Sequence, residues 1–153
     1  MLRATLDRPE VLVSATISDA QDAFLRSHHQ AVLVTIRRDG SPQTSNLSYL
    51  FDGETMRVSV TDARAKVANI RRDPRVVVHV LGDNFWTYAS VQGEASLSEV
   101  TTEPGDAPGR ALLEIYNGIA GPHPDDDEFL RDMVAQGRLV LTVHPTRVVS
   151  PGL

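Results

Sequence analysis

The chain has 153 residues, a formal net charge of −5 and no cysteine. One domain is the default for this length, and apolar residues, 41% of the total, are enough for a hydrophobic core. No stretch approaches the roughly 20 consecutive apolar residues of a membrane span, and the N-terminus lacks the apolar segment of a signal peptide. The composition excludes disulfides and thiolate chemistry and argues against nucleic acid and membranes as partners. It predicts a cytoplasmic location.

Strand signals outnumber helix signals along the chain, and turn sequences such as Asp39-Gly40 and Asp52-Gly53 separate them. Ser18 and Asp62 are the predicted N-caps of the first two helices. The predicted elements, in order, are a helix over 18–29, strands over 31–37, 43–51 and 55–60, a helix over 63–72, strands over 76–81 and 86–97, helices over 110–119 and 126–136, and strands over 139–144 and 147–149.

The order of these elements predicts the fold class. Successive hairpins indicate a mostly antiparallel sheet, closed or nearly closed, in a mainly β fold with peripheral helices (α+β). The apolar run over 76–81 is predicted to be buried on both faces, and the small residues of 89–97 are predicted to face the inside of a tight barrel. We expect one domain over residues 18–153, preceded by an N-terminal arm over residues 1–17.

A candidate phosphate site lies where the strand over 55–60 meets the following helix. Ser59 and Thr61 project from the polar face of the strand. Arg64 and Lys66 lie in the first turn of the helix, where free backbone N–H groups favour anions. Lys66 is the only lysine among fifteen basic residues, which suggests a role that needs a compact, mobile charge. The alternative is a solvated basic helix face.

Two further groups of residues are candidates for binding a flat ring. The strand over 43–49 is unusually polar, and Asn46 and Ser48 share one face, where a heteroaromatic ring would satisfy their hydrogen bonds. Trp86 and Tyr88 share a face of their own strand and suit a stacking wall. An edge strand facing water is the alternative for the first group, and core or interface packing is the alternative for the second.

Catalytic side chains are not evident in the sequence. Nothing resembles a Ser/His/Asp arrangement, and the five histidines lack metal-ligand spacing. The acidic run over 125–128 is explained by its place at the start of a helix. We therefore predict no catalytic residue and no metal site. A ligand-binding barrel without an acid–base pair depends on a cofactor for its chemistry.

The segments over 31–46, 58–75 and 86–95 resemble the pyridoxamine 5′-phosphate oxidase-like split β-barrel superfamily. Their spacing and the segment Ile119-Ala120-Gly121 are most similar to the branch of F420-dependent flavin/deazaflavin oxidoreductases. The resemblance implies a split β-barrel of the FMN-binding type, which acts as a homodimer with cofactor clefts at the subunit interface. It also implies hydride transfer from reduced coenzyme F420 to an unsaturated small-molecule acceptor.

The same resemblance assigns positions to the cofactor. The turn with Arg64 and Lys66 would hold its phosphate, and the strand with Asn46 and Ser48 would line its ring. Residues near Trp86 and Tyr88 would come from the partner subunit.

Two other functions remain open at this stage. An FMN-dependent enzyme similar to pyridoxamine-phosphate oxidase would use the same phosphate site, and a non-catalytic cofactor-binding protein would need no catalytic residue. F420 carries more negative charge than FMN, and Arg71, Arg72 and Arg75 continue the basic run past Lys66. We therefore predict a preference for F420 over FMN that weakens as the salt concentration rises.

Overall fold

The computed structural model describes residues 13–153. Its elements are α1 (Asp19–Ser27), β1 (Gln30–Ile36), β2 (Pro42–Ser48), β3 (Leu50–Phe51), β4 (Met56–Thr61), α2 (Ala65–Arg72), β5 (Arg75–Leu81), β6 (Tyr88–Leu97), α3 (Ala107–Ala120), α4 (Asp126–Ala135) and β7 (Arg138–Val149).

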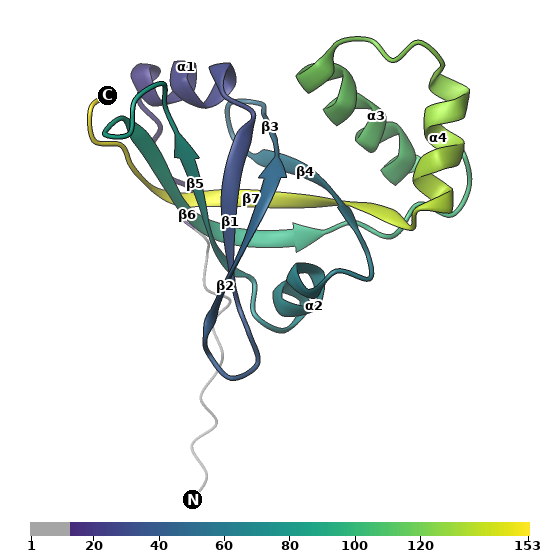
Figure 1. Cartoon of the computed structure of the whole chain (residues 1–153), viewed down its shortest axis with the longest axis horizontal. Helices are drawn as coiled ribbons and strands as arrows, with labels where there is room; N and C mark the ends of the chain where they lie inside the picture. The colour runs from purple at the N-terminus through teal and green to yellow at the C-terminus, as the bar shows by residue number, and fades with distance from the viewer. Residues whose placement is uncertain (1–12) are drawn as a thin grey trace, which may run out of the picture.

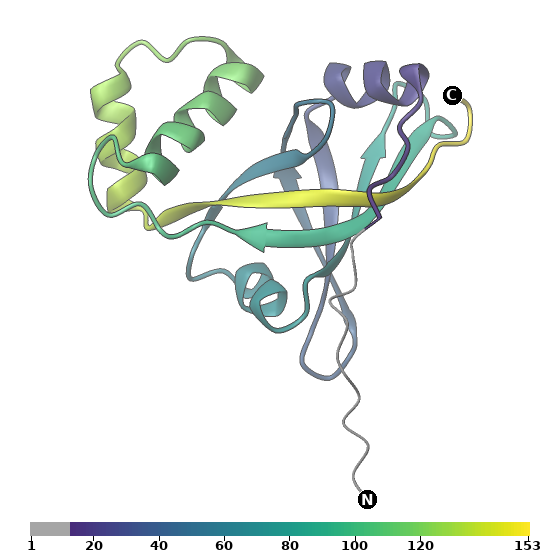
Figure 2. The ribbon, with the colours of Figure 1, turned by 180° about the vertical axis from the view of Figure 1, so that it is seen from behind.

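The seven strands form one antiparallel sheet in the order β2-β1-β5-β6-β7-β4-β3. The sheet curls, so that β2 at one edge comes into contact with β4 near the other edge (Figures 1 and 2). No ladder of hydrogen bonds joins β2 to β4 within residues 13–153, and the barrel stays split between them. The predicted α+β split β-barrel is confirmed.

The main core fills the inside of the curled sheet. The strands contribute alternate residues to it, and Ala89, Val91 and Ala95 of β6 are buried there as predicted. α1 adds Phe24 and Leu25 to the same core. The clean alternation of burial along the strands is the reason that one face of the sheet forms the core.

A second, smaller core lies under the helical excursion between β6 and β7. α3 and α4 stand side by side at one end of these two long strands (green, Figure 1). Their buried residues join one residue of β7 to form a separate cluster, which consists of Leu112, Ile115, Phe129, Met133 and Val140. Asp106 and Asp125 cap the two helices, each by accepting a hydrogen bond from a backbone N–H in the first turn.

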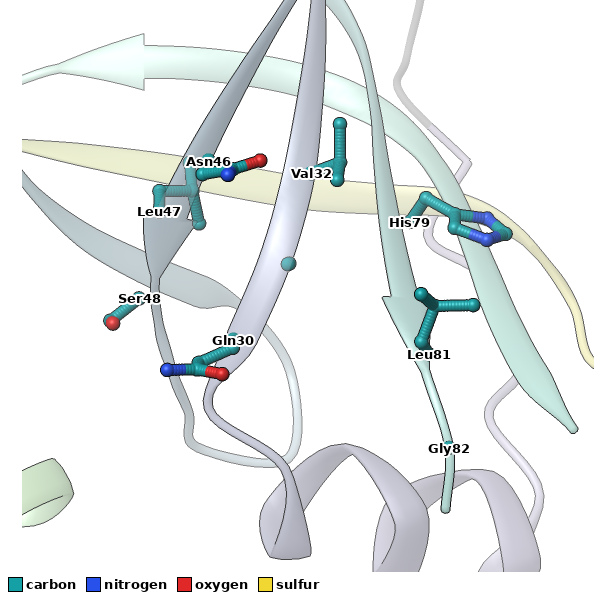
Figure 3. Close-up of a pocket in the computed structure, with 9 residues that line it drawn as sticks. Gln30, Val32, Asn46, Leu47, Ser48, His79, Leu81 and Gly82 are labelled. Carbon is teal, nitrogen blue, oxygen red and sulfur yellow. The ribbon is translucent and has the colours of Figure 1, made fainter. Parts of the chain in front are cut away.

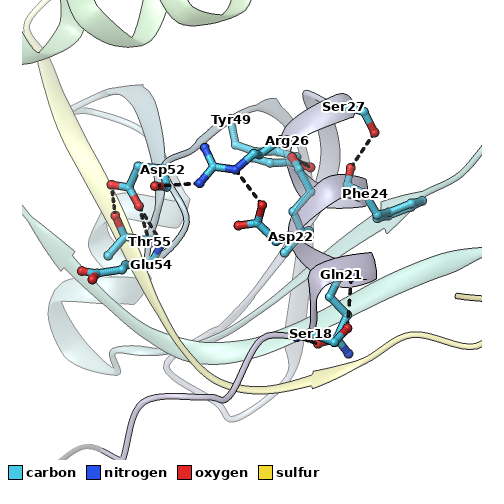
Figure 4. Close-up of polar contacts among 11 residues, drawn as sticks. Ser18, Gln21, Asp22, Phe24, Arg26, Ser27, Tyr49, Asp52, Glu54 and Thr55 are labelled. Carbon is cyan, nitrogen blue, oxygen red and sulfur yellow. Dashed lines mark hydrogen bonds and ion pairs between the residues drawn. The ribbon is translucent and has the colours of Figure 1, made fainter.

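α1 packs against the main core and lies next to β3. Ser18 and Gln21 form a capping box at its start, which confirms the predicted N-cap. Figure 4 shows Arg26 reaching from α1 to the β3–β4 turn, where its Nη2 donates to the backbone oxygen of Asp52 (3.2 Å). The hydroxyl of Tyr49, a fully buried residue, donates to the carbonyl of Leu25 (3.0 Å).

Three strand predictions need correction. The strand predicted over 43–51 is two strands, because Tyr49 turns into the core and the chain leaves β1 to pair with β4. The strands predicted over 139–144 and 147–149 are the single strand β7. The run over 76–81 is buried on one face only: Val77 and His79 on the other face are partly exposed, and Leu81 is 48% exposed.

The predicted N-terminal arm falls mostly on residues 1–12, which lie outside the described residues. In its described part, Ala15 N donates to Pro145 O (2.9 Å) and Ile17 packs against the main core. The division into an arm and one domain stays a prediction. Among residues 13–153, no helix is both long enough and apolar enough to cross a membrane.

Candidate functional site

The split between β2 and β4 holds a polar cleft of about 480 Å³, which we call the cradle. It is lined by Gln43, Ser45, Asn46, Leu47, Ser48, Ser59, Val60, Thr61, Arg64, Ala65, Lys66 and Arg138. Six of the eight predicted site residues are therefore brought together, from two strands and the start of α2. Trp86 and Tyr88 are not among them.

The backbone contributes to the cradle as well as the side chains. Within the described sheet, β2 pairs only with β1, and β4 beyond Arg57 pairs only with β7. The two strand edges that face the split therefore carry N–H and C=O groups without a strand partner. Such edges can donate to and accept from the ring N–H and C=O groups of a flat ligand.

The start of α2 differs from the prediction. The helix begins at Ala65 with Arg64 at the N-cap position, and Asp62 is not its cap. The carboxylate of Asp62 instead pairs with the guanidinium of Arg71. No acidic side chain lies in the first turn, so the partial positive charge of the helix N-terminus is left for an anion in the cradle.

Lys66 lies in an environment that is unfavourable to its positive charge. Burial lowers the pKa of its amine below the ordinary value, and the positive charges of Arg64 and Arg138 lower it further. This direction is expected for an amine that is partly desolvated and repelled by two neighbouring cations. No carboxylate of residues 13–153 lies within 4.0 Å of any of the three. An anion bound in the cradle would relieve this repulsion.

Arg138 is the cradle residue that the sequence reasoning missed. It is the first residue of β7, directly opposite Thr61 of β4. Its Nη1 donates to Ser59 Oγ (3.3 Å) and its Nε donates to Gln136 Oε1 (2.8 Å), so its partners are neutral. The only sequence signal was an arginine that follows Gly137 and precedes an apolar run.

A buried polar group supports the cradle from behind. Asn69 of α2 is buried, and its Nδ2 donates both to Thr35 Oγ1 (3.0 Å) and to Gln43 Oε1 (3.0 Å). Arg72 Nη2 donates to Asn69 Oδ1 (2.9 Å), which fixes the orientation of this amide. Gln43 belongs to the strand over 43–49 whose polarity the sequence showed, but its support by Asn69 was not predicted.

Trp86 and Tyr88 lie on the outer side of the sheet, away from the cradle. Trp86 precedes β6 in a turn held by Asn84, is 77% exposed and packs edge-on against Phe85. The predicted strand over 86–97 thus begins two residues later, at Tyr88. The ring of Tyr88 lies against His79 of β5, with ring centres 4.9 Å apart.

His79 lines a second concavity, which we call the outer hollow. It has a volume of about 660 Å³ and lies on β1, β2 and β5, on the uncovered face of the sheet. Figure 3 shows Val32, His79 and Leu81 on this face. Asn46 and Ser48 line both the outer hollow and the cradle, because β2 is an edge strand with both faces open.

The basic run past Lys66 is less available than the sequence suggested. Arg71 pairs with Asp62, and Arg75 pairs with Asp73 (2.6 Å). Arg72 is held by Asn69. In their place, Arg138 is the third cation of the cradle that has no carboxylate partner among residues 13–153.

A curled antiparallel sheet whose split is lined by cations and open strand edges defines a split β-barrel protein with an anion-compatible cleft. The chain belongs to the pyridoxamine 5′-phosphate oxidase family, whose model matches residues 17–150. This is the family that the resemblance in the sequence indicated.

Individual relatives agree with this assignment. An F420H(2)-dependent biliverdin reductase of Mycobacterium tuberculosis (strain CDC 1551 / Oshkosh) is 31% identical over 90 residues, which cover 58% of this chain and 64% of that protein. A solved structure described as an F420 reductase superposes with a TM-score of 0.64 at 26% identity, over 87% of this chain and 98% of the other. The conserved hypothetical protein Rv2991 of Mycobacterium tuberculosis superposes with a TM-score of 0.69 at 26% identity, over 90% of this chain and 86% of the other.

The names of the family and of two of these relatives are those of oxidoreductases, and both of those relatives are named for F420. The similarity to the F420-dependent branch that was inferred from the sequence is therefore confirmed as a similarity. The alignment with the biliverdin reductase spans just under two thirds of that protein.

Proposed function

We propose that the chain is an F420-dependent reductase that delivers a hydride to an unsaturated small-molecule acceptor and works as a homodimer. The names of two relatives support the cofactor and the direction of transfer. The family name is equally compatible with FMN, so the cofactor has to be argued from the cradle.

The cluster of Arg64, Lys66 and Arg138 is the observation that carries the proposal. These cations converge on one cleft without a carboxylate partner among residues 13–153, and the pKa of Lys66 is lowered there. Three positive charges exceed what a neutral ligand needs. They suit a ligand with a phosphodiester and further carboxylates, which F420 has, and they also accept the single phosphate of FMN.

The rest of the cradle fits a ring cofactor. The open edges of β2 and β4 offer backbone donors and acceptors to ring amide groups, and Asn46 and Ser48 add side-chain partners. When bound, reduced F420 supplies a hydride: a ring C–H bond breaks, a C–H bond forms on the acceptor, and a solvent proton completes the two-electron reduction. The tasks left to the chain are to bind, to orient the two reactants and to exclude water.

The homodimer is proposed from the uncovered face of the sheet. Val32, His79 and Leu81 face outward at the outer hollow, and Phe85 and Trp86 are exposed in the turn that follows Gly82, another residue of its lining. An exposed apolar patch of this kind marks a protein interface more often than free surface. A second copy seated there would bring its own Trp86 and Tyr88 toward the cleft of the first.

A titration separates this function from its two alternatives. The purified protein should be colourless, should quench the fluorescence of added F420, and should oxidise reduced F420 when an acceptor such as biliverdin is present. If the purified protein is yellow and contains FMN, it is an FMN-dependent enzyme and the proposal is wrong. If the protein binds F420 but does not oxidise reduced F420 with any of the acceptors tested, it is a non-catalytic carrier of the cofactor.

A further inference from the structure

Another cavity, which is largely apolar, opens beside the cradle. It has a volume of about 540 Å³, lies under α3 and α4, and is called here the helix pocket. Six large hydrophobic or aromatic residues make up most of its wall: Leu112, Ile115, Tyr116, Ile119, Phe129 and Met133. A pocket of this size and polarity is typical of sites for small organic molecules.

The helix pocket and the cradle share part of their walls. Ser48, Ser59 and Arg138 line both of them, so a ligand in one lies next to a ligand in the other. Of these three residues only Arg138 is charged. A guanidinium in the wall of an otherwise apolar pocket selects ligands that join an apolar body to an anionic group.

We propose that the helix pocket binds the acceptor, and that the acceptor is a flat, conjugated and largely apolar molecule that carries a carboxylate. This inference rests on the proposed reductase function and names its substrate class. The conjugated body lies among the six apolar residues, and the carboxylate pairs with Arg138. In this position an electron-poor carbon of the acceptor receives the hydride at the border with the cradle, and a neighbouring atom takes a proton from solvent.

The acceptor is assigned to the helix pocket rather than to the outer hollow because of their linings. The outer hollow is lined by Gln30, Asn46 and Ser48, and its one titratable side chain is His79. Neither lysine nor arginine is part of this lining, and the hollow opens on the face where the second copy is proposed. The helix pocket combines an apolar wall with a guanidinium whose hydrogen-bond partners among residues 13–153 are neutral. Charge complementarity therefore favours the helix pocket for an anionic acceptor.

The test uses pyrenebutyrate, a flat fluorescent hydrocarbon with a carboxylate, titrated into the full chain without cofactor. Ala120 is the last residue of α3, is exposed and lines the helix pocket, so Ala120→Trp fills the pocket without disturbing a core. Ala135 is the exposed last residue of α4 and does not line it, so Ala135→Trp is the matched control. We expect Ala120→Trp to weaken binding at least about tenfold, and Ala135→Trp to leave it unchanged. Equal binding by the two variants would overturn the proposal.

A second pair of variants tests the carboxylate. Arg138→Gln should weaken pyrenebutyrate binding about tenfold but should not change the binding of pyrenebutanol, its neutral counterpart. Arg131→Gln, on the exposed side of α4, should affect neither probe. Equal losses for both probes in Arg138→Gln would mean that the arginine only shapes the pocket, which contradicts the proposed ligand class.

Saturating F420 decides whether the helix pocket belongs to the acceptor or to the cofactor. Retained binding of pyrenebutyrate supports an acceptor site, and its displacement by F420 would assign the pocket to the cofactor. If F420 does not bind the wild-type protein, the proposed function fails, while the probe titrations still decide whether the helix pocket takes apolar carboxylates.

Discussion

The side-chain amide of Asn69 donates a hydrogen bond to Gln43 Oε1 over 3.0 Å, and this bond joins the buried side of α2 to the edge strand β2. Because the oxygen of Gln43 is occupied in this way, its NH₂ group is the end left for a ligand in the cradle. The buried polar cluster thus sets which hydrogen-bonding group the cradle presents.

Replacing Asn69 should therefore affect both stability and ligand binding. We expect Asn69→Leu to lower the free energy of unfolding by about 1–3 kcal/mol, because Thr35 and Arg72 lose a buried partner. F420 affinity should fall several-fold, since Gln43 is no longer held. Thr35→Val is the control: it removes a buried partner of Asn69 but not of Gln43, and should lower stability without changing affinity. Denaturant unfolding and fluorescence titration of both variants measure the two effects, and equal affinity losses would argue against the positioning role.

Lys66→Ala should weaken F420 binding by roughly ten- to a hundredfold without unfolding the protein, because a charge-assisted contact to phosphate contributes about 1.5–3 kcal/mol. Lys66→Arg should lose part of the affinity, since the planar guanidinium cannot take the position of the amine. Arg71→Ala provides the comparison, because Arg71 is already paired with Asp62 and should matter little. If Lys66→Ala binds F420 as tightly as the wild type, the cradle does not hold the phosphate of the cofactor.

The affinity for F420 should also depend on pH. Burial and the two neighbouring arginines lower the pKa of Lys66, so in the ligand-free protein the amine loses its proton at a lower pH than an exposed lysine. A bound phosphate favours the protonated amine and raises this pKa. Affinity should therefore be full below the lowered pKa and should fall as the pH rises through it. Titrations from neutral to alkaline pH should show this fall in the wild type and not in Lys66→Arg, whose side chain stays charged.

F420 should bind more tightly than FMN, and its affinity should fall more steeply with ionic strength. Both ligands carry a phosphate, but the additional carboxylates of F420 meet cations that are partly exposed and therefore screened by salt. Dissociation constants of both cofactors, measured across a series of salt concentrations, check the order and the slopes. If FMN binds more tightly than F420 at any salt concentration, the protein is better explained as an FMN-dependent enzyme.

The protein should be a dimer at micromolar concentration, joined through the outward face of β5. Leu81→Arg should shift it toward the monomer, because a charge in an apolar interface is left without a partner. Leu153, also exposed but at the end of the chain, gives the control variant Leu153→Arg, which should stay dimeric. If light scattering shows that the wild type is a monomer at this concentration, the cofactor cleft is not shared between two subunits.

The sequence was sufficient for the fold and for most of the cradle, since those features depend on local patterns. Alternating burial, turn sequences and the strand-to-helix junction at residues 55–72 are visible in single segments. Arg138 was missed because its position depends on the pairing of Thr61 with a residue far along the chain. Asp62 was predicted as a helix cap because the competing ion pair with Arg71 becomes possible only after α2 has formed.

The two separate cores have a consequence for how the activity of this protein can change. The strands that form the cradle pack on the main core. In contrast, four of the six large apolar residues that line the helix pocket belong to the small core of α3 and α4. Substitutions in the excursion between β6 and β7 can therefore reshape one site without altering the packing that holds the other. We expect divergent members of such a lineage to exchange their acceptors through residues 98–137 while keeping one cofactor.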